Sequence, residues 1–126
     1  MHTSQEQTLL DFIDCWRRLD LDDVMAHFAT DAVYHSDLKS PPLVGVGTIR
    51  ALLADHIRRI ARYEAEVLKL AVAGNVVFLE RIERLSMPDG RSLTLPIVAV
   101  FELDDAGKIA TWRDYWDTSM ATPAPQ

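Results

Sequence analysis

The apolar positions of the chain follow a helical period up to about residue 60 and an alternating period afterwards. The first helical stripe consists of Leu9, Phe12, Ile13, Trp16 and Leu19. Thr3 with Glu6, or Ser4 with Gln7, offers a capping box in front of it. This pattern predicts an amphipathic helix near the beginning of the chain.

Two further helices are predicted before the alternating half. Asp20 can cap a short helix that runs to about His27. The apolar stripe of the other helix consists of Ile49, Leu52, Leu53, Ile57 and Ile60. Between these helices, "DAVYHSDL" (31–38) is typical of a strand, and "KSPPLVGVG" is typical of a loop stiffened by two prolines.

From Tyr63 onward, extended segments are separated by turn signals. The signals are Gly74-Asn75, Pro88 to Gly90, and Asp104 to Gly107. They predict four strands in a meander. Helices followed by antiparallel strands indicate an α+β fold in which helices cover one face of a sheet. We expect one domain over residues 1–117 and a flexible C-terminal tail, "TSMATPAPQ", over 118–126.

Composition and charge exclude some classes of function. The chain has 126 residues, of which 48% are hydrophobic and 25% charged, as expected for one globular domain. Its net charge of -6 argues against nucleic acid or an anionic membrane as partner. No signal peptide or membrane span is evident, so the predicted location is the cytoplasm. Cys15, the single cysteine, falls in the first helical stripe and is interpreted as a buried thiol.

Charged residues interrupt both faces of the segment "VVFLERIERLS" (76–86), so either buried face would take charge with it. Arg81 and Glu83 share one face, about 7 Å apart along the strand. In the later stretch "TWRDYWD" (111–117), alternation places Asp114 between two tryptophans on one face. If both faces border the same interior, Arg81 can bridge two carboxyl groups.

Such a pair of acids has a defined chemical use. Two carboxyl groups in unequal surroundings ionise unequally, and together they supply a general base and a general acid. The pattern alone equally allows Arg81 and Glu83 to form a solvated ion pair, with Asp114 merely ending a strand.

Three stretches carry a resemblance to a known family: "VYHSDLKSPPLVG", "FLERIERL" and "LPIVAVFELDDAGKIATWRDYWD". In order and spacing they resemble the limonene-1,2-epoxide hydrolase family, in the SnoaL-like and nuclear transport factor 2-like (NTF2-like) fold group. The resemblance implies a cone-shaped α+β fold with a curved mixed sheet covered on one face by three helices. It also implies a homodimer that needs no cofactor.

Carried over by position, the family's water-activating aspartate falls on Asp114 and its bridging arginine on Arg81. The acid that protonates the epoxide oxygen falls on Glu83. The two residues that hold the water with the aspartate fall on Tyr34 and Ser36. Two positions depart from the family: Glu83 replaces an aspartate and is longer by a methylene, and Ser36 replaces an asparagine.

Apolar residues near these positions are candidates for the substrate-binding wall, with plain core packing as the alternative. They are Leu53, Ile57, Leu85, Leu95, Ile97, Trp112 and Trp116. His27, His35 and His56 lack metal-ligand spacing, so no metal site is predicted. Pro96, inside a predicted strand, indicates a sheet edge or a bulge.

The predicted function is hydrolysis of a small lipophilic epoxide to a vicinal diol by one-step general acid/base attack of water. One alternative is a SnoaL-like cyclase or ketosteroid-isomerase-like enzyme, in which an acid abstracts a proton next to a carbonyl. Another is a non-catalytic dimeric module that binds lipophilic ligands.

Overall fold

The computed structural model describes residues 3–121 and contains one six-stranded sheet in the order β2-β1-β6-β5-β4-β3. The predicted four-strand meander is confirmed. Its strands are β3 (Arg62–Ala73), β4 (Val76–Ser86), β5 (Ser92–Leu103) and β6 (Ile109–Tyr115). Neighbouring strands of the meander are antiparallel, and the predicted turns separate them.

The early strand β1 (Phe28–His35) makes the sheet mixed, because it pairs parallel to β6 and antiparallel to β2. Tyr34 of β1 lies opposite Trp112 of β6. The strand begins and ends about three residues earlier than the sequence predicted. The predicted loop also contains a two-residue strand, β2 (Leu43–Val44), which alternation cannot detect at that length.

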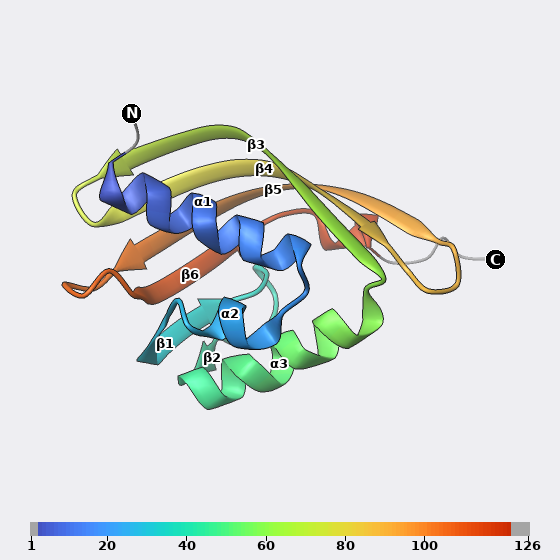
Figure 1. Ribbon diagram of the computed structural model, residues 1–126, viewed down its shortest axis with the longest axis horizontal. Helices are drawn as coiled ribbons and strands as arrows, with labels where there is room; N and C mark the ends of the chain where they lie inside the picture. Colours follow the sequence, from blue (N-terminus) through green and yellow to red (C-terminus); the bar gives the residue numbers. More distant parts are fainter. Residues whose placement is uncertain (1–2, 122–126) are drawn as a thin grey trace.

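Three helices gather on one side of the curved sheet (Figure 1), as predicted. They are α1 (Ser4–Arg17), α2 (Leu21–Met25) and α3 (Val46–Arg59). Thr3 caps α1, since its hydroxyl accepts a hydrogen bond from the backbone N–H of Glu6, and Asp20 caps α2. None of the described helices has the length and apolar content needed to cross a membrane.

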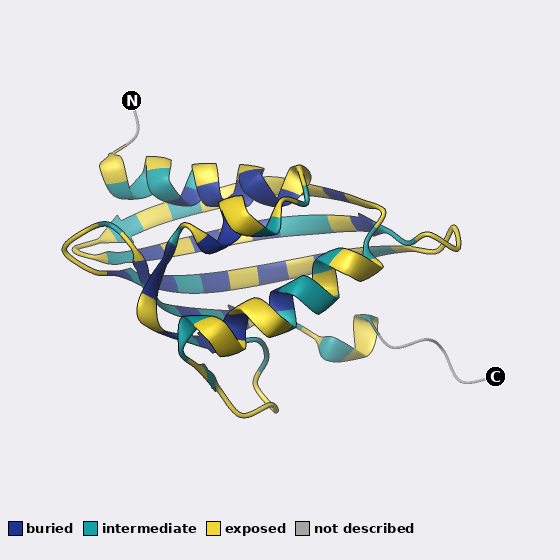
Figure 2. Ribbon diagram, turned by 60° about the horizontal axis from the view of Figure 1, so that its bottom comes forward, coloured by how far each residue is buried: buried dark blue, intermediate teal, exposed yellow. Residues whose placement is uncertain are grey.

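Buried and exposed residues alternate along the central strands (Figure 2), and β4 shows which of its two faces is buried. Val77 and Leu79 are buried, whereas Phe78 between them is 44% exposed. Arg81 therefore enters the interior with the apolar residues of its face. Pro96 of β5 pairs with β4, but the register of β5 with β6 starts only at Val98. Pro96 thus occupies an edge-like part of its strand, as predicted.

The end of the chain departs from the predicted tail. Thr118–Met120 form a short 3-10 helix, η1, and Asp117 caps it by accepting a hydrogen bond from the N–H of Ser119. Ala121 lines the cavity described below. Residues 122–126 of the predicted tail lie outside the described residues.

Candidate active site

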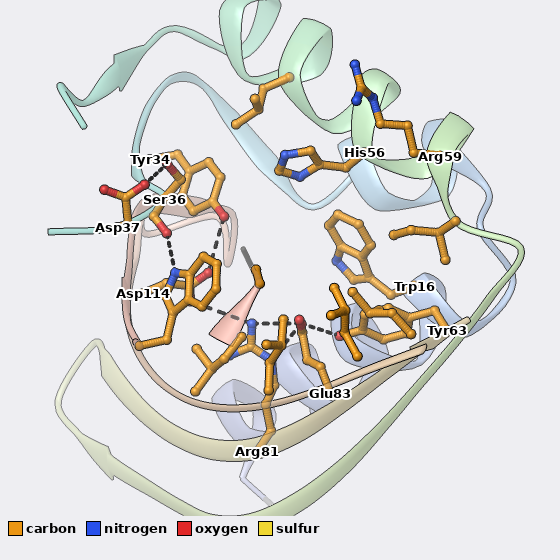
Figure 3. Close-up of a pocket in the computed structure, with 18 of the residues that line it drawn as sticks. Trp16, Tyr34, Ser36, Asp37, His56, Arg59, Tyr63, Arg81, Glu83 and Asp114 are labelled. Carbon is orange, nitrogen blue, oxygen red and sulfur yellow. Dashed lines mark hydrogen bonds and ion pairs between the residues drawn. The ribbon is translucent and has the colours of Figure 1, made fainter. Parts of the chain in front are cut away.

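A cavity of about 440 Å³ lies between the helices and the concave face of the sheet. Its walls are mostly apolar, and polar side chains enter it from β4, β6 and the end of β1 on one side and from α3, where His56 and Arg59 lie, on the other (Figure 3). The five predicted catalytic residues all line it: Tyr34, Ser36, Arg81, Glu83 and Asp114. Its size is within the range of small-molecule sites.

Arg81 lies between the two acids and is only 2% exposed. Its Nε and Nη2 donate to Oε2 of Glu83 over 3.2 and 3.1 Å, and Nη2 lies 3.6 Å from Oδ1 of Asp114. Burial alone would lower the pKa of Arg81, but the charges of Asp114 and Glu83 outweigh it and raise that pKa. Arg81 is therefore a permanent cation that bridges both carboxyl groups, and more closely Glu83.

Asp114 is buried and held by two neutral donors. Trp112 Nε1 donates to Oδ1 over 2.7 Å, and the Tyr34 hydroxyl donates to Oδ2 over 3.2 Å. The Tyr34 ring stacks on Trp112 with centroids 4.0 Å apart. Burial raises the pKa of Asp114 to about 6, although Arg81 acts in the opposite direction. At neutral pH this carboxylate is mostly ionised, with a pKa close to the working range of a general base.

Glu83 faces the same cavity through a different set of contacts. The Tyr63 hydroxyl donates to Oε2 over 2.6 Å, and the hydrogen bonds from Arg81 end on that same oxygen. Within the described part of the chain, every hydrogen bond to Glu83 therefore uses Oε2, which leaves Oε1 for a proton and a ligand. Burial raises the pKa of Tyr63, and the Glu83 charge raises it further, so Tyr63 stays protonated and donates.

Ser36 borders the cavity, but its side chain hydrogen-bonds elsewhere. Its hydroxyl lies 3.5 Å from Oδ2 of Asp37, at the long limit of a hydrogen bond. Its carbonyl oxygen accepts from Trp116 Nε1 over 2.8 Å. Tyr34 thus contacts Asp114 directly, whereas Ser36 lies beside the acid without a hydrogen bond to it.

Most of the predicted wall residues line the cavity: Leu85, Leu95, Ile97, Trp112 and Trp116. The prediction was wrong for Leu53 and Ile57. Leu53 is fully buried in the core and Ile57 packs against the core, while Leu52 and His56 of α3 face the cavity. One apolar stripe on a helix is wide enough to cover both core and cavity, so spacing does not separate the two roles.

Sequence reasoning missed two aromatic residues of the site, Trp16 and Tyr63. Their rings lie 5.7 Å apart and both line the cavity. The signal for Tyr63 was present in the alternation, because in register it lies opposite Leu85, two residues from Glu83 on the same face. Trp16 is part of the first helical stripe and could be interpreted only as core.

Groups of three or more potential metal ligands do not occur among the described residues. The chemistry available to the cavity is that of the two carboxyl groups and their donors. One acid has a pKa close to the working range of a general base, the other keeps one oxygen without a hydrogen bond among the described residues, and a fixed cation lies between them. This arrangement suits reactions that remove one proton and deliver another within an apolar site.

The model of the SnoaL-like domain matches residues 9–112. The chain belongs to the SnoaL-like family. The epoxide hydrolase EphG of Mycobacterium tuberculosis is 30% identical over 111 residues, which cover 84% of this chain and 68% of EphG. This SnoaL-like chain is therefore a homologue of a protein named as an epoxide hydrolase.

Solved structures agree with the cone-shaped NTF2-like fold that was predicted. A LEH-like epoxide hydrolase from M. tuberculosis matches with a TM-score of 0.79 at 26% identity, over 92% of this chain and 84% of that one. The epoxide hydrolase/cyclase-like enzyme SalBIII, described in pyran ring formation in polyether salinomycin, matches with a TM-score of 0.82 over 92% of each chain. Its identity is 17%, so it supports the fold alone.

Proposed function

We propose that this protein hydrolyses a small lipophilic epoxide to a vicinal diol in one step. The observation that carries the proposal is the buried array in which Arg81 contacts both Glu83 and Asp114 at the wall of an apolar cavity. Similarity to EphG and to the LEH-like enzyme supports the same class of substrate.

In the proposed reaction Asp114 takes a proton from a water molecule held beside Tyr34 and Ser36. The water oxygen attacks one epoxide carbon, and the bond from that carbon to the epoxide oxygen breaks. Glu83 donates a proton to the opening oxygen through Oε1. The turnover leaves Asp114 protonated and Glu83 ionised, and a net proton transfer from Asp114 to Glu83 restores the starting state. No covalent ester and no cofactor take part.

The surroundings of each group suit its proposed role. Trp112 and Tyr34 fix both oxygens of Asp114, so the base is oriented before substrate arrives. Burial and the Asp114 charge keep the pKa of Tyr34 well above 10, so its hydroxyl remains a donor. Arg81 offsets the charge that shifts from one acid to the other.

A second candidate is proton abstraction from a carbon next to a carbonyl, as in a SnoaL-like cyclase or a ketosteroid-isomerase-like enzyme. The buried hydroxyl of Tyr34, 3.2 Å from Asp114, favours this candidate because it could stabilise an enolate beside the base. The contacts of Arg81 and Tyr63 with Glu83 have no role in that reaction. The homodimer and the cytoplasmic location stay predictions.

One panel of terpene epoxides, steroid enones and fluorescent apolar ligands separates the candidates. For an accepted epoxide, Asp114→Asn and Glu83→Gln should each reduce kcat/KM by at least about 100-fold. Glu80→Gln is the matched control, since Glu80 is exposed on the other face of β4. Turnover of enones without epoxides would favour proton abstraction. Binding of apolar ligands without any turnover would favour the binding module.

A further inference from the structure

The cavity wall contains a second arginine that the proposed reaction does not use. Arg59, at the end of α3, lines the cavity on the side opposite Arg81 and Glu83 (Figure 3). Among the described residues of the wall, Arg59 and Arg81 are the only arginines, and no lysine joins them. Because Arg81 is paired with the two acids, Arg59 is the cation that is left for a ligand.

One side of the Arg59 guanidinium is held and the other is free. Its Nε forms an ion pair with Oδ2 of Asp55, one helical turn earlier, over 3.0 Å. Within residues 3–121, neither Nη1 nor Nη2 has a protein partner. The N–H groups at that end of a guanidinium match the two oxygens of a carboxylate. Asp55 thus orients the side chain and leaves a pair of donors for an anion.

The last turn of α3 also keeps a positive charge. Arg58 pairs with the other oxygen of Asp55, so two arginines share one carboxylate and one positive charge stays unbalanced. The Arg59 side chain is 70% exposed, and water therefore weakens any ion pair that it forms. This site can select an anionic ligand over a neutral one, but only by a modest factor.

The interior of the cavity does not offer an anion an alternative place. Asp114 and Glu83 border it, and the one cation there, Arg81, already contacts both. A ligand carboxylate placed beside them would meet like charge without a free donor cation. An elongated anionic ligand therefore gains most with its charged end at α3 and its neutral end at the two acids.

The opposite side of the open space carries an acid as well. Asp37 lies there, across from Arg59 (Figure 3). Hydrogen bonds from the backbone N–H groups of Ser40 and Lys39 lower the pKa of Asp37, so it stays ionised at neutral pH. An anionic group is thus directed away from this side and toward α3.

We propose that Arg59 binds a carboxylate at the end of the substrate that is remote from the epoxide. The substrate class is an epoxide of a long-chain carboxylic acid, with the alkyl chain lying along the apolar wall between Arg59 and the two acids. This proposal rests on the proposed function for the position of the epoxide beside Asp114 and Glu83. Arg59 acts as a specificity-determining residue and takes no part in proton transfer.

The test uses matched pairs of linear terminal epoxides of increasing chain length. Each pair has a carboxylate on the far end of one member and a primary amide, of the same shape without the charge, on the other. For wild type, kcat/KM of the acid should exceed that of the amide by about threefold to fivefold at one favoured length, the upper range for an exposed ion pair. The difference should lie in KM, because Arg59 is remote from the reacting atoms.

Two variants of Arg59 and one control identify the contact. Arg59→Gln should bring the ratio of acid to amide to about one, and Arg59→Lys, which keeps the charge without the planar pair of donors, should retain part of it. Arg58→Gln is the matched control: it removes the same charge from the neighbouring position, which lies outside the cavity wall, and should leave most of the preference.

Three results would overturn the proposal. One is a wild type that prefers the amide at every chain length, and another is a ratio that Arg59→Gln leaves unchanged. The third is an equal loss in Arg58→Gln and Arg59→Gln, which would show a general effect of charge in place of a contact. Raising the salt concentration from about 20 mM to about 500 mM should also bring the wild-type ratio toward one.

Binding is measured separately, so that the two proposals can fail separately. All three tryptophans of the chain, Trp16, Trp112 and Trp116, line the cavity, so quenching of their fluorescence reports ligand binding. In the Asp114→Asn background, the acids should bind about threefold to fivefold more tightly than their amides, and Arg59→Gln should abolish the difference. Binding preference without hydrolysis by wild type would contradict the hydrolase proposal alone. Hydrolysis without binding preference would contradict the role of Arg59 alone.

Discussion

At Asp114, burial and the charge of Arg81 act in opposite directions, and burial is the larger influence. The flanking tryptophans explain why the carboxyl group tolerates this position. Trp112 donates a hydrogen bond to the carboxylate and forms part of the apolar wall, and Trp116 lines the cavity and donates a hydrogen bond to the carbonyl oxygen of Ser36. The result is a carboxylate whose pKa is raised to about 6 but which remains mostly ionised at neutral pH.

This pKa predicts an acid limb in the pH profile of the free enzyme. Because the base must be ionised, kcat/KM should fall about tenfold per pH unit below a midpoint near 6. The measurement is the initial rate of epoxide hydrolysis between pH 4 and 8. A midpoint close to the ordinary aspartate value of 3.8 would contradict the account of Asp114.

The pH dependence of the free energy of unfolding tests whether this acid limb belongs to Asp114. A pKa raised in the folded state means that folding favours the protonated acid, so its contribution is fully present below about 3.8 and lost as the pH rises through about 6. The free energy of unfolding of wild type minus that of Asp114→Asn should therefore decrease by about 3 kcal/mol over this range. A difference that does not change with pH would assign the acid limb to another group.

At the scale of elements, β3 and β4 together position the proposed general acid. Glu83 is longer than the aspartate of the family it resembles, and Tyr63 on the neighbouring strand holds the extended carboxyl group over 2.6 Å. The hydrogen bond fixes Oε2 and leaves Oε1 without a hydrogen bond among the described residues. A misplaced catalytic group can cost on the order of 100-fold in rate, so this support matters for the longer side chain.

Tyr63→Phe removes this support while it keeps the ring. We expect kcat to fall by roughly tenfold with a smaller change in KM, as for loss of one hydrogen bond that orients the general acid. In the Glu83→Asp background the shorter side chain withdraws from Tyr63, so the same substitution should have a smaller effect there. Steady-state kinetics of wild type, the two single variants and the double variant measures the coupling.

Tyr115→Phe is the control for this cycle, because Tyr115 is 40% exposed and points away from the cavity. Equal effects of Tyr63→Phe in the two backgrounds would show that Tyr63 does not position Glu83.

At the scale of the whole molecule, strands were easier to interpret than helices. A strand has two faces, so alternation placed Arg81 with Glu83, and Trp112 with Asp114, as soon as the strands were recognised. The resemblance then brought Tyr34 and Ser36 to the same cavity. A helix offers a continuous range of directions, and the prediction therefore selected Leu53 where His56 and its neighbours face the cavity.

Contacts between residues on different elements could not be predicted from the sequence pattern. The bond from Tyr63 to Glu83 depends on the register of β3 against β4, and the cavity role of Trp16 depends on how α1 packs over the sheet. The two-residue strand β2 is too short to show a period. Periodicity assigned the elements and their faces, and tertiary packing decided which faces meet.

The central claim, one-step attack by water, is tested most directly by a single turnover in oxygen-18 water with enzyme in excess over epoxide. If Asp114 activates water, the first diol formed carries one labelled oxygen, and the protein carboxylates stay unlabelled. Mass spectrometry of the diol and of the peptide that contains Asp114 reads both outcomes. An unlabelled first diol, with the label found in the carboxyl group of Asp114 or Glu83, would contradict the account and require a covalent ester intermediate.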